Sequence, residues 1–264
     1  MKHRVPRSRL FHVKHWPDDA PAAVCYAPPM TDTRSEIDEG LTTLGIAHTG
    51  GQVFALELHL QLVAEANAAF NLTTIPLEQS VALHVLDSVV ALPFLAAAPP
   101  GGFADLGSGA GYPGVPLAVL TGRQLTLVES VKKKAAFLES VVGELRLDAT
   151  VQGVRAEELA GERPGAFAAV TARAVSSLPS LVELAAPLLV RGGLLICLKG
   201  APEETELTRG DVVARRCGLA RVETVAVEVP GVEGRRTIVV YRRTGRAGVS
   251  LPRRNGMAQR QPLA

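Results

Sequence analysis

The segment at residues 103–114 reads FADLGSGAGYPG, an apolar run that ends in closely spaced glycines just before a helical pattern. Glycine has no Cβ, so a glycine-rich turn lets a ligand lie directly against the backbone. In α/β sheets, a turn between a strand and the next helix lies at the ligand-binding edge. Glu129 stands twenty-two residues after Gly107, at the end of the next apolar run, where its carboxylate can accept hydrogen bonds from both hydroxyls of a ribose. The spacing therefore predicts an adenosine-binding half-site.

Two classes of adenosine cofactor fit this half-site. Gly109, Gly111 and Gly114 match the pattern GxGxxG, which allows a dinucleotide. Asp105, two residues before Gly107, favours S-adenosylmethionine, because an acid there can approach the methionine ammonium group and would oppose a pyrophosphate. We therefore expect S-adenosylmethionine, and an NAD(P)-dependent oxidoreductase stays open as an alternative.

Short apolar runs alternate with helical patterns from residue 102 onward, and these elements must position the glycine turn. We predict seven strands, at residues 102–106, 124–129, 149–153, 168–171, 194–198, 221–228 and 237–241. Helices are predicted between most of them, at residues 115–120, 132–145, 178–189 and 203–217. Such alternation favours an α/β fold in which a mostly parallel sheet has helices on both faces. The last two strands have no helix between them, so they should form an antiparallel hairpin.

The chain divides into four segments by composition. Residues 31–98 predict an N-terminal helical extension, with helices at 53–70 and from Pro76 to about Leu95, and residues 99–243 predict the sheet domain. Residues 244–264 hold four arginines and no acidic residue, which predicts a basic flexible tail. Residues 1–30 have no sustained pattern; they are either an arm outside the core or an untranslated leader before Met30.

The net charge of +2 is unevenly distributed along the chain. The first 30 residues carry +3 and the last 21 carry +4, so residues 31–243 carry −5. The charge of the core therefore gives no argument for nucleic-acid binding. A surface for a polyanion must be local or lie in the tail, whose arginines are candidates for contacts with RNA phosphates.

Composition also excludes some classes of protein. The most apolar stretch, at 178–198, is interrupted by Glu183, Pro187 and Arg191, so no membrane span is predicted. The three cysteines are far apart in the sequence and predict neither a disulfide framework nor a metal pair; they are Cys25, Cys197 and Cys217. We expect a cytoplasmic protein that holds no metal.

Further blocks in the chain share their order with a known family: NLT at 71–73, HVLDS at 84–88, the glycine block at 105–117, TARA at 171–174, LKG at 198–200 and RRTIVV at 235–240. From about Ile37 to Leu263 the chain resembles the RsmG (GidB) family. The resemblance implies a Rossmann-like class I methyltransferase sheet of seven strands, with the last strand antiparallel, and S-adenosylmethionine as cofactor. It also implies methylation of guanine N7 in 16S ribosomal RNA of the 30S subunit.

The resemblance places Gly107, Tyr112, Ala156, Glu157 and Arg173 in the cofactor site. Members often have another large apolar residue where this chain has Tyr112, which leaves the tyrosine hydroxyl unexplained. Without the resemblance, Glu157 would be interpreted as a solvated loop charge. Arg173 ends an apolar strand at the ligand-binding edge, which favours a functional role.

Polar residues outside the glycine turn are the candidates for substrate contacts: Asn71, His84, Asp87, Ser88 and Lys199. His84, Asp87 and Ser88 lie on one face of a predicted helix, where they form either a structural hydrogen-bond cluster or a surface that faces the substrate. Lys199 ends a strand at the same edge as Arg173, and either could address guanine O6 or a phosphate. We assign no catalytic base, because guanine N7 already has a lone pair and catalysis can rest on alignment.

Three points stay open at this stage. A non-catalytic ribosome-assembly factor that keeps a nucleotide-binding fold is a second alternative to the methyltransferase. The lysines at 132–134 begin a helix against its dipole, so they are either a solvated face or an RNA contact. We expect a monomer.

Overall fold

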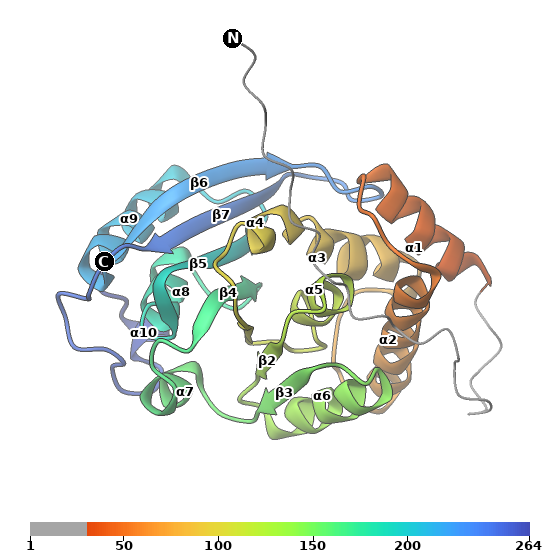
Figure 1. Cartoon of the computed structure of the whole chain (residues 1–264), viewed down its shortest axis with the longest axis horizontal. Coiled ribbons are helices and arrows are strands. Elements are labelled where there is room, and N and C mark those ends of the chain that lie inside the picture. The colour runs from red at the N-terminus through yellow and green to blue at the C-terminus, as the bar shows by residue number, and fades with distance from the viewer. Residues whose placement is uncertain (1–30) are drawn as a thin grey trace, which may run out of the picture.

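A seven-stranded sheet runs through the part of the chain that the structure describes, residues 31–264 of a computed structural model (Figure 1). Its order is β3-β2-β1-β4-β5-β7-β6. The strands are β1 (Phe103–Leu106), β2 (Leu125–Val128), β3 (Ala149–Gln152), β4 (Phe167–Arg173), β5 (Leu189–Lys199), β6 (Leu219–Val227) and β7 (Arg236–Arg243). Only β7 runs antiparallel to its neighbours, which confirms the predicted sheet. The predicted arm at 1–30 lies outside the described residues.

Helices cover both faces of the sheet, so its central strands β1, β2 and β4 are buried on both sides. In β1, Phe103 packs into one core cluster while Ala104 and Leu106 pack into the other. The helices of the sheet domain are α5 (Gly114–Thr121), α6 (Lys132–Glu144), α7 (Ala156–Glu162), α8 (Leu178–Ala185), α9 (Glu204–Cys217) and α10 (Met257–Arg260). Alternating side chains that are buried on both faces explain why the strand sequences are nearly continuous apolar runs. Within residues 31–264, no helix combines the length and apolar character that crossing a membrane requires.

The N-terminal extension packs into the same core cluster as α5 and α6 (Figure 1). Its elements are α1 (Thr31–Thr43), α2 (Gly50–Ala69), a 3-10 turn η1 (Leu77–Gln79), a π-helix η2 (Val81–Leu86), α3 (Asp87–Val89) and α4 (Leu92–Ala96). Helix α2 begins with a capping box between Thr49 and Gln52. The single helix predicted from Pro76 is thus divided, and its middle turn is a π-helix, a geometry that is frequent at functional sites.

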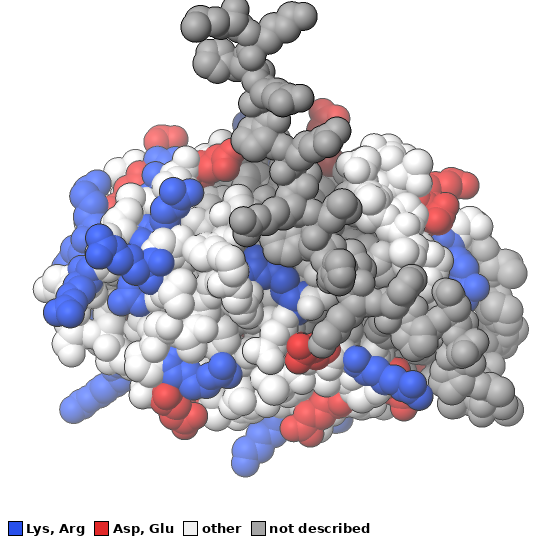
Figure 2. Space-filling view, viewed as in Figure 1, with Lys and Arg blue, Asp and Glu red and all other residues white. Residues whose placement is uncertain are grey.

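The C-terminal segment, 244–264, differs from the flexible tail that the sequence predicts. Arg253 forms a two-pronged ion pair with the buried Glu183 of α8, at 2.6 and 2.7 Å, and Ala258 is 2% exposed. A buried carboxylate needs a partner, and this segment supplies it. The prediction was wrong because composition reports the charges of a segment but not the distant group that binds them. Figure 2 shows basic side chains gathered at the end of the molecule where α9, β6 and the C-terminus lie.

Candidate active site

A cavity of about 690 Å³ opens at the carboxyl edge of the central strands, between the sheet and the helical extension. Sheet-domain loops and the extension both contribute to its lining. Its polar and glycine lining includes Asn71, Thr73, His84, Asp87, Gly107, Gly109, Tyr112, Lys134, Arg173, Lys199 and Arg236. This is the edge where ligands bind in open α/β sheets, and the volume suits a small-molecule cofactor.

The glycine turn presents bare backbone to this cavity. Gly107, Gly109 and Gly111 have positive φ values of 64°, 56° and 98°, which a side chain would strain. A Cβ on Gly109 would meet only the carbonyl oxygen of Gly107, at 3.8 Å, so it would point into open space. Ser108 holds the turn to the sheet, because its hydroxyl donates to the Asp105 carbonyl and accepts from the Val128 amide. The turn can therefore receive a flat ligand against its backbone.

Glu129 joins the glycine turn to the start of α6. Its Oε2 accepts a hydrogen bond from the Gly109 amide at 3.0 Å, and its Oε1 accepts one from the Val131 amide at 2.8 Å. The side chain is oriented by these two amides, and each carboxylate oxygen keeps a second lone pair. Glu129 is 7% exposed and is not among the residues that line the cavity, but it is bonded to Gly109, which does line it. A ribose beside Gly109 could use those lone pairs, so the arrangement fits the adenosine half of S-adenosylmethionine.

Asp105 lies beneath the turn, not among the residues that line the cavity. It is fully buried, and its Oδ1 accepts a hydrogen bond from the Thr171 hydroxyl at 2.7 Å. Burial raises the pKa of Asp105 to about 6, although hydrogen bonds from Thr171 and Ser108 oppose the change. A Cβ on Gly114 would come within 2.8 Å of it. In the structure its carboxylate is held by Thr171 beneath the turn, and its approach to the methionine ammonium group stays a prediction.

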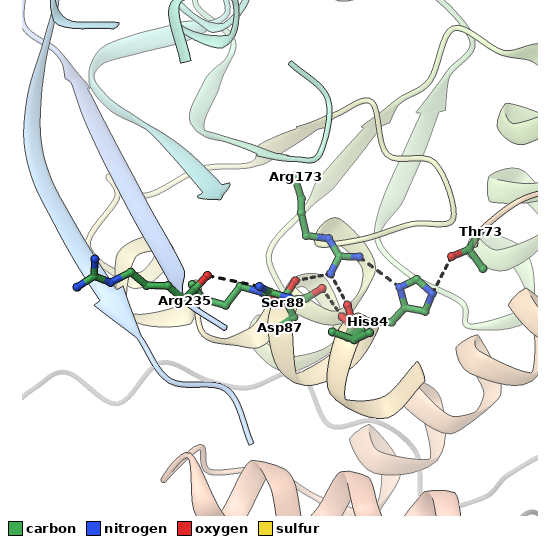
Figure 3. Close-up of polar contacts among 8 residues, drawn as sticks. Thr73, His84, Asp87, Ser88, Arg173 and Arg235 are labelled. Carbon is green, nitrogen blue, oxygen red and sulfur yellow. Dashed lines mark hydrogen bonds and ion pairs between the residues drawn. The ribbon is translucent and has the colours of Figure 1, made fainter. Parts of the chain in front are cut away.

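The opposite wall of the cavity is a cluster of charged side chains (Figure 3). Arg173, at the end of β4, donates from one nitrogen to Asp87 Oδ2 and to the Leu83 carbonyl, both at 2.7 Å. The other oxygen of Asp87 accepts from Arg236 Nε at 2.8 Å. One carboxylate thus holds two guanidinium groups in place, and the cluster keeps a net positive charge.

His84 connects this cluster to the Asn-Leu-Thr block. Its Nδ1 accepts from Arg173 at 3.3 Å, and since a guanidinium can only donate, the imidazole proton lies on Nε2 and is donated to Thr73 Oγ1 at 3.2 Å. Burial, together with the positive charge of Arg173, lowers the pKa of His84 to about 3. The ring stacks on Tyr112 with centroids 4.2 Å apart. His84 is therefore neutral and held on three sides.

Tyr112 supports the charged wall from below. Arg173 lies over its ring at 5.4 Å, and the ring is 4% exposed. The hydroxyl is buried and has no hydrogen-bond partner among the described residues, and its burial raises the pKa of the phenol. The ring, not the hydroxyl, makes the contacts that involve the site.

The remaining predicted residues fall into two groups. Asn71 and Lys199 line the cavity, and Lys199 is partly neutralised by Glu206 at 2.9 Å. Ser88 is fully buried and its hydroxyl donates to the His84 carbonyl within the same helix, so it faces the helix and not the cavity. Neither Ala156 nor Glu157 lines the cavity.

Glu157 makes its contact with the C-terminal segment. Its carboxylate accepts a hydrogen bond from the Gly256 amide at 2.7 Å, and the side chain is 6% exposed. Ala156 packs against the core cluster that contains α7 and α8. A cofactor role of these two residues would therefore have to use their backbone or the Ala156 methyl group, and it stays a prediction.

Arg236, Thr73 and Lys134 line the cavity but were not among the predicted site residues. Arg236 and Thr73 fall inside blocks that carried the family resemblance, so a signal for both was present in the sequence. Lys134 belongs to the lysine run that begins α6 and lines the cavity. The pairing of Arg236 with Asp87 could not be found, because the two residues lie 149 positions apart.

Sheet order, glycine turn and terminal acid define an adenosine-cofactor enzyme of the class I methyltransferase type. The family described as rRNA small subunit methyltransferase G matches this chain over residues 52–238, and the chain belongs to that family. A relative of the same name from Pelotomaculum thermopropionicum is 36% identical over 240 residues, covering 89% of this chain and all of the relative. Another, from Sorangium cellulosum, is 38% identical over 216 residues, covering 80% of this chain and 90% of the relative.

Family membership decides several predictions. The chain is a methyltransferase with S-adenosylmethionine as its methyl donor, which confirms the family, the enzyme class and the cofactor that the sequence predicted. The alternatives of an NAD(P)-dependent oxidoreductase and of a non-catalytic assembly factor are thereby set aside.

Proposed function

We propose that this enzyme transfers a methyl group to N7 of one guanine in 16S ribosomal RNA of the small ribosomal subunit. One observation carries the proposal: a bare-backbone turn suited to an adenosine cofactor and a positively charged cluster suited to RNA face the same cavity. The small-subunit rRNA named in the family description gives the substrate class.

The glycine turn, together with Glu129, forms what we call the donor wall, which binds and orients the cofactor. S-adenosylmethionine supplies an electrophilic methyl group on a sulfonium sulfur. The backbone at Gly107 and Gly109 gives the ligand a close approach, and Glu129, fixed by two amides, can accept from the ribose hydroxyls. Holding the two reactants in line can contribute about 7–11 kcal/mol to lowering the barrier.

The chemistry of guanine N7 removes the need for a general base, and among the described residues the two candidates in the cavity, His84 and Asp87, already have hydrogen-bond partners. His84 is neutral and its lone-pair nitrogen accepts from Arg173. Both oxygens of Asp87 accept from guanidinium groups. A nucleophile that must first lose a proton would find neither group available, whereas N7 attacks through its existing lone pair. This favours N7 over the exocyclic amine of guanine.

The charged wall suits the RNA. Arg173 and Arg236 can donate to guanine O6 or to a phosphate, and Asp87 fixes where they point. Positive charge develops on the purine during transfer. The carboxylate of Asp87, which the two arginines share, moderates the repulsion between their guanidinium groups and that charge. A base inside an A-form helix cannot reach such a cavity, so the target guanine must be splayed out of its stack.

Transfer of a labelled methyl group tests the proposal. The purified full chain is incubated with labelled S-adenosylmethionine and either 30S subunits or deproteinised 16S RNA from cells that lack this modification. We expect label in one nucleotide, identified as N7-methylguanine by mass spectrometry of RNase fragments. Label on another atom or base, or no label in either RNA, would refute the proposal. A ribosomal substrate also implies a cytoplasmic location, and the monomer stays a prediction that light scattering can check.

A further inference from the structure

One buried histidine contacts the glycine turn from the helical extension. His59 lies in α2, and none of its surface is exposed. Its Nε2 lies 2.8 Å from the Ala110 carbonyl oxygen, and its ring lies against Tyr112 with centroids 4.5 Å apart. A Cβ on Gly111 would come within 2.9 Å of the same nitrogen. A single side chain of the extension therefore contacts three consecutive residues of the turn.

The protonation state of His59 follows from its partner. A carbonyl oxygen can only accept, so Nε2 carries the proton and donates it to Ala110. The other ring nitrogen, Nδ1, is buried and has no hydrogen-bond partner among the described residues. Burial lowers the pKa of His59 to about 4, so the ring is neutral near pH 7. A leucine would fill this position without burying an unpaired nitrogen. The advantage of an imidazole at this position is therefore its hydrogen bond to the turn.

The turn is the part of the cavity that most needs such support. Its backbone passes through positive φ at Gly109 and Gly111, on either side of Ala110. The residue just before Ala110 gives its amide to Glu129 and lines the cavity. Fixing the Ala110 carbonyl therefore fixes the orientation of the adjoining peptide, which the cofactor must meet.

Tyr112 extends the contact across the cavity. His59 lies against one side of its ring and His84 stacks on it with planes 5° apart. His84 in turn accepts from Arg173 in the charged wall. A continuous column of three rings thus joins α2, the glycine turn and η2.

We propose that His59 is a positioning residue of the methyl-donor site, which holds the Ala110 carbonyl and the Tyr112 ring so that the turn keeps its binding shape. Donor affinity then depends on one hydrogen bond from the N-terminal extension, although that helix supplies no residue to the donor wall. The inference rests on the proposed function only in that both use the donor site. Donor binding is measured without RNA, so the two can fail separately.

Two substitutions at His59 separate the hydrogen bond from packing. His59→Leu fills the space and removes the donor, while His59→Gln keeps an N–H near the position of Nε2. Leu56→Ala, one turn earlier in α2, is the matched control, because Leu56 is buried in the same core and its truncation lowers stability through packing alone. The full chain is used throughout, with S-adenosylmethionine and S-adenosylhomocysteine as the probes in isothermal titration calorimetry.

We expect His59→Leu to weaken binding of both probes by about tenfold, the order of effect of one lost orienting hydrogen bond, with little change in the Tm of the unliganded protein. His59→Gln should restore affinity to within about threefold, and Leu56→Ala should lower the Tm while affinity stays within about twofold. With RNA present, His59→Leu should raise KM for the donor more than it lowers kcat.

Three results would overturn the proposal: unchanged probe affinity in His59→Leu, no recovery in His59→Gln, or a loss of affinity in Leu56→Ala equal to that in His59→Leu. If His59→Leu fails to fold, His59→Asn replaces it, because its amide is too short to reach Ala110 and the same loss is expected. A chain that binds the donor normally but methylates no RNA refutes the proposed function and leaves this inference standing.

Discussion

The two walls of the cavity are built in different ways. The donor wall comes from one short stretch, residues 107–112, with Glu129 from the end of the next strand, and it works through backbone amides and the absence of side chains. The charged wall gathers side chains from distant parts of the chain: Arg173 and Asp87 are 86 positions apart, and Asp87 and Arg236 are 149 apart. A local wall is fixed by local geometry, whereas a wall of distant side chains depends on the whole fold.

The walls also differ in what a substitution should do. On the donor wall, an added atom occupies space that the ligand needs, and no charge changes. On the charged wall, removal of one group leaves its partners unpaired in a partly buried place, where charges are costly. Variants should therefore separate donor binding from RNA methylation.

The largest effect is expected at Asp87. Asp87→Asn keeps the shape but removes the charge that holds Arg173 and Arg236. Loss of one partner from such a pair should lower kcat/KM for 30S subunits by about 10²- to 10³-fold. Donor affinity, measured by calorimetry, should stay within about threefold because no donor-wall contact changes.

Ser88→Ala is the control for this experiment. Ser88 is the next residue and is also buried, but its hydroxyl donates to the His84 carbonyl one turn earlier. It should leave methylation nearly unchanged. Equal losses in the two variants, or a collapse of donor affinity in Asp87→Asn, would show that the walls do not act separately.

On the donor wall, a substitution should weaken donor binding and leave RNA binding unchanged, the reverse of what is expected for Asp87→Asn. Gly109→Ala adds a methyl group that meets only a carbonyl oxygen at 3.8 Å, so it projects toward the ligand, and the positive φ of 56° also strains the turn. Donor affinity should fall by about tenfold, and RNA affinity in gel-shift titrations should be retained. Gly107→Arg is a blunter test, because a Cβ there would lie 2.7 Å from Val175 and would disturb the protein itself. Wild-type donor affinity in Gly109→Ala would remove this turn from the binding site.

The contrast between the walls explains what the sequence could predict. The seven strands, the antiparallel last strand and the glycine turn follow from short-range patterns, and the structure reproduces them. The family blocks indicated Arg173 and His84 one by one, but no spacing rule could show that Asp87 joins Arg173 to Arg236. The π-helix at Val81–Leu86 was missed for a related reason, because helical periodicity does not distinguish it from an α-helix.

The C-terminal segment and Asp105 show the same limit for buried charges. Composition predicted that the arginines of 244–264 are free, yet Arg253 is bound to Glu183. Asp105 has the type and position of a ligand contact, but in the structure its carboxylate is fully buried and accepts a hydrogen bond from Thr171. Where a charged side chain points depends on partners that only the fold brings near.

A third, smaller effect concerns the C-terminal segment. Arg253→Gln leaves the buried Glu183 without its cation, and since the arginine is itself partly exposed we expect a loss of about 3 kcal/mol in the free energy of unfolding. That corresponds to a fall in Tm of roughly 6–12 °C by calorimetry. Arg254→Gln, at an exposed neighbour, is the control and should change the Tm by about 1 °C or less. Similar Tm values for the two variants would mean that the segment does not stabilise the fold through this pair.

The smallest effect concerns the single buried charge beneath the donor wall. The pKa of Asp105 is raised from 3.8 to about 6, so the folded protein binds its proton more tightly than the unfolded chain does. The stability that this group contributes is therefore fully present below about pH 3.8 and is lost as the pH rises through about 6. At pH 7.5 the carboxylate is ionised in a buried place, with Thr171 and Arg173 offsetting part of the cost. Asp105→Asn removes this titration and keeps the shape.

The free energy of unfolding of Asp105→Asn should exceed that of the wild type by about 1–2 kcal/mol at pH 7.5, and the difference should shrink as the pH falls to 5. His59 and His84, whose pKa values are lowered, titrate in the same range with the opposite sign, but they are present in both proteins and cancel in the difference. Urea titrations at several pH values measure it. A difference that does not depend on pH would mean that Asp105 does not titrate in this window. A less stable variant at pH 7.5 would mean that the charge itself, attracted by Arg173, holds the turn, so the donor wall would then depend on a long-range ion pair as the opposite wall does.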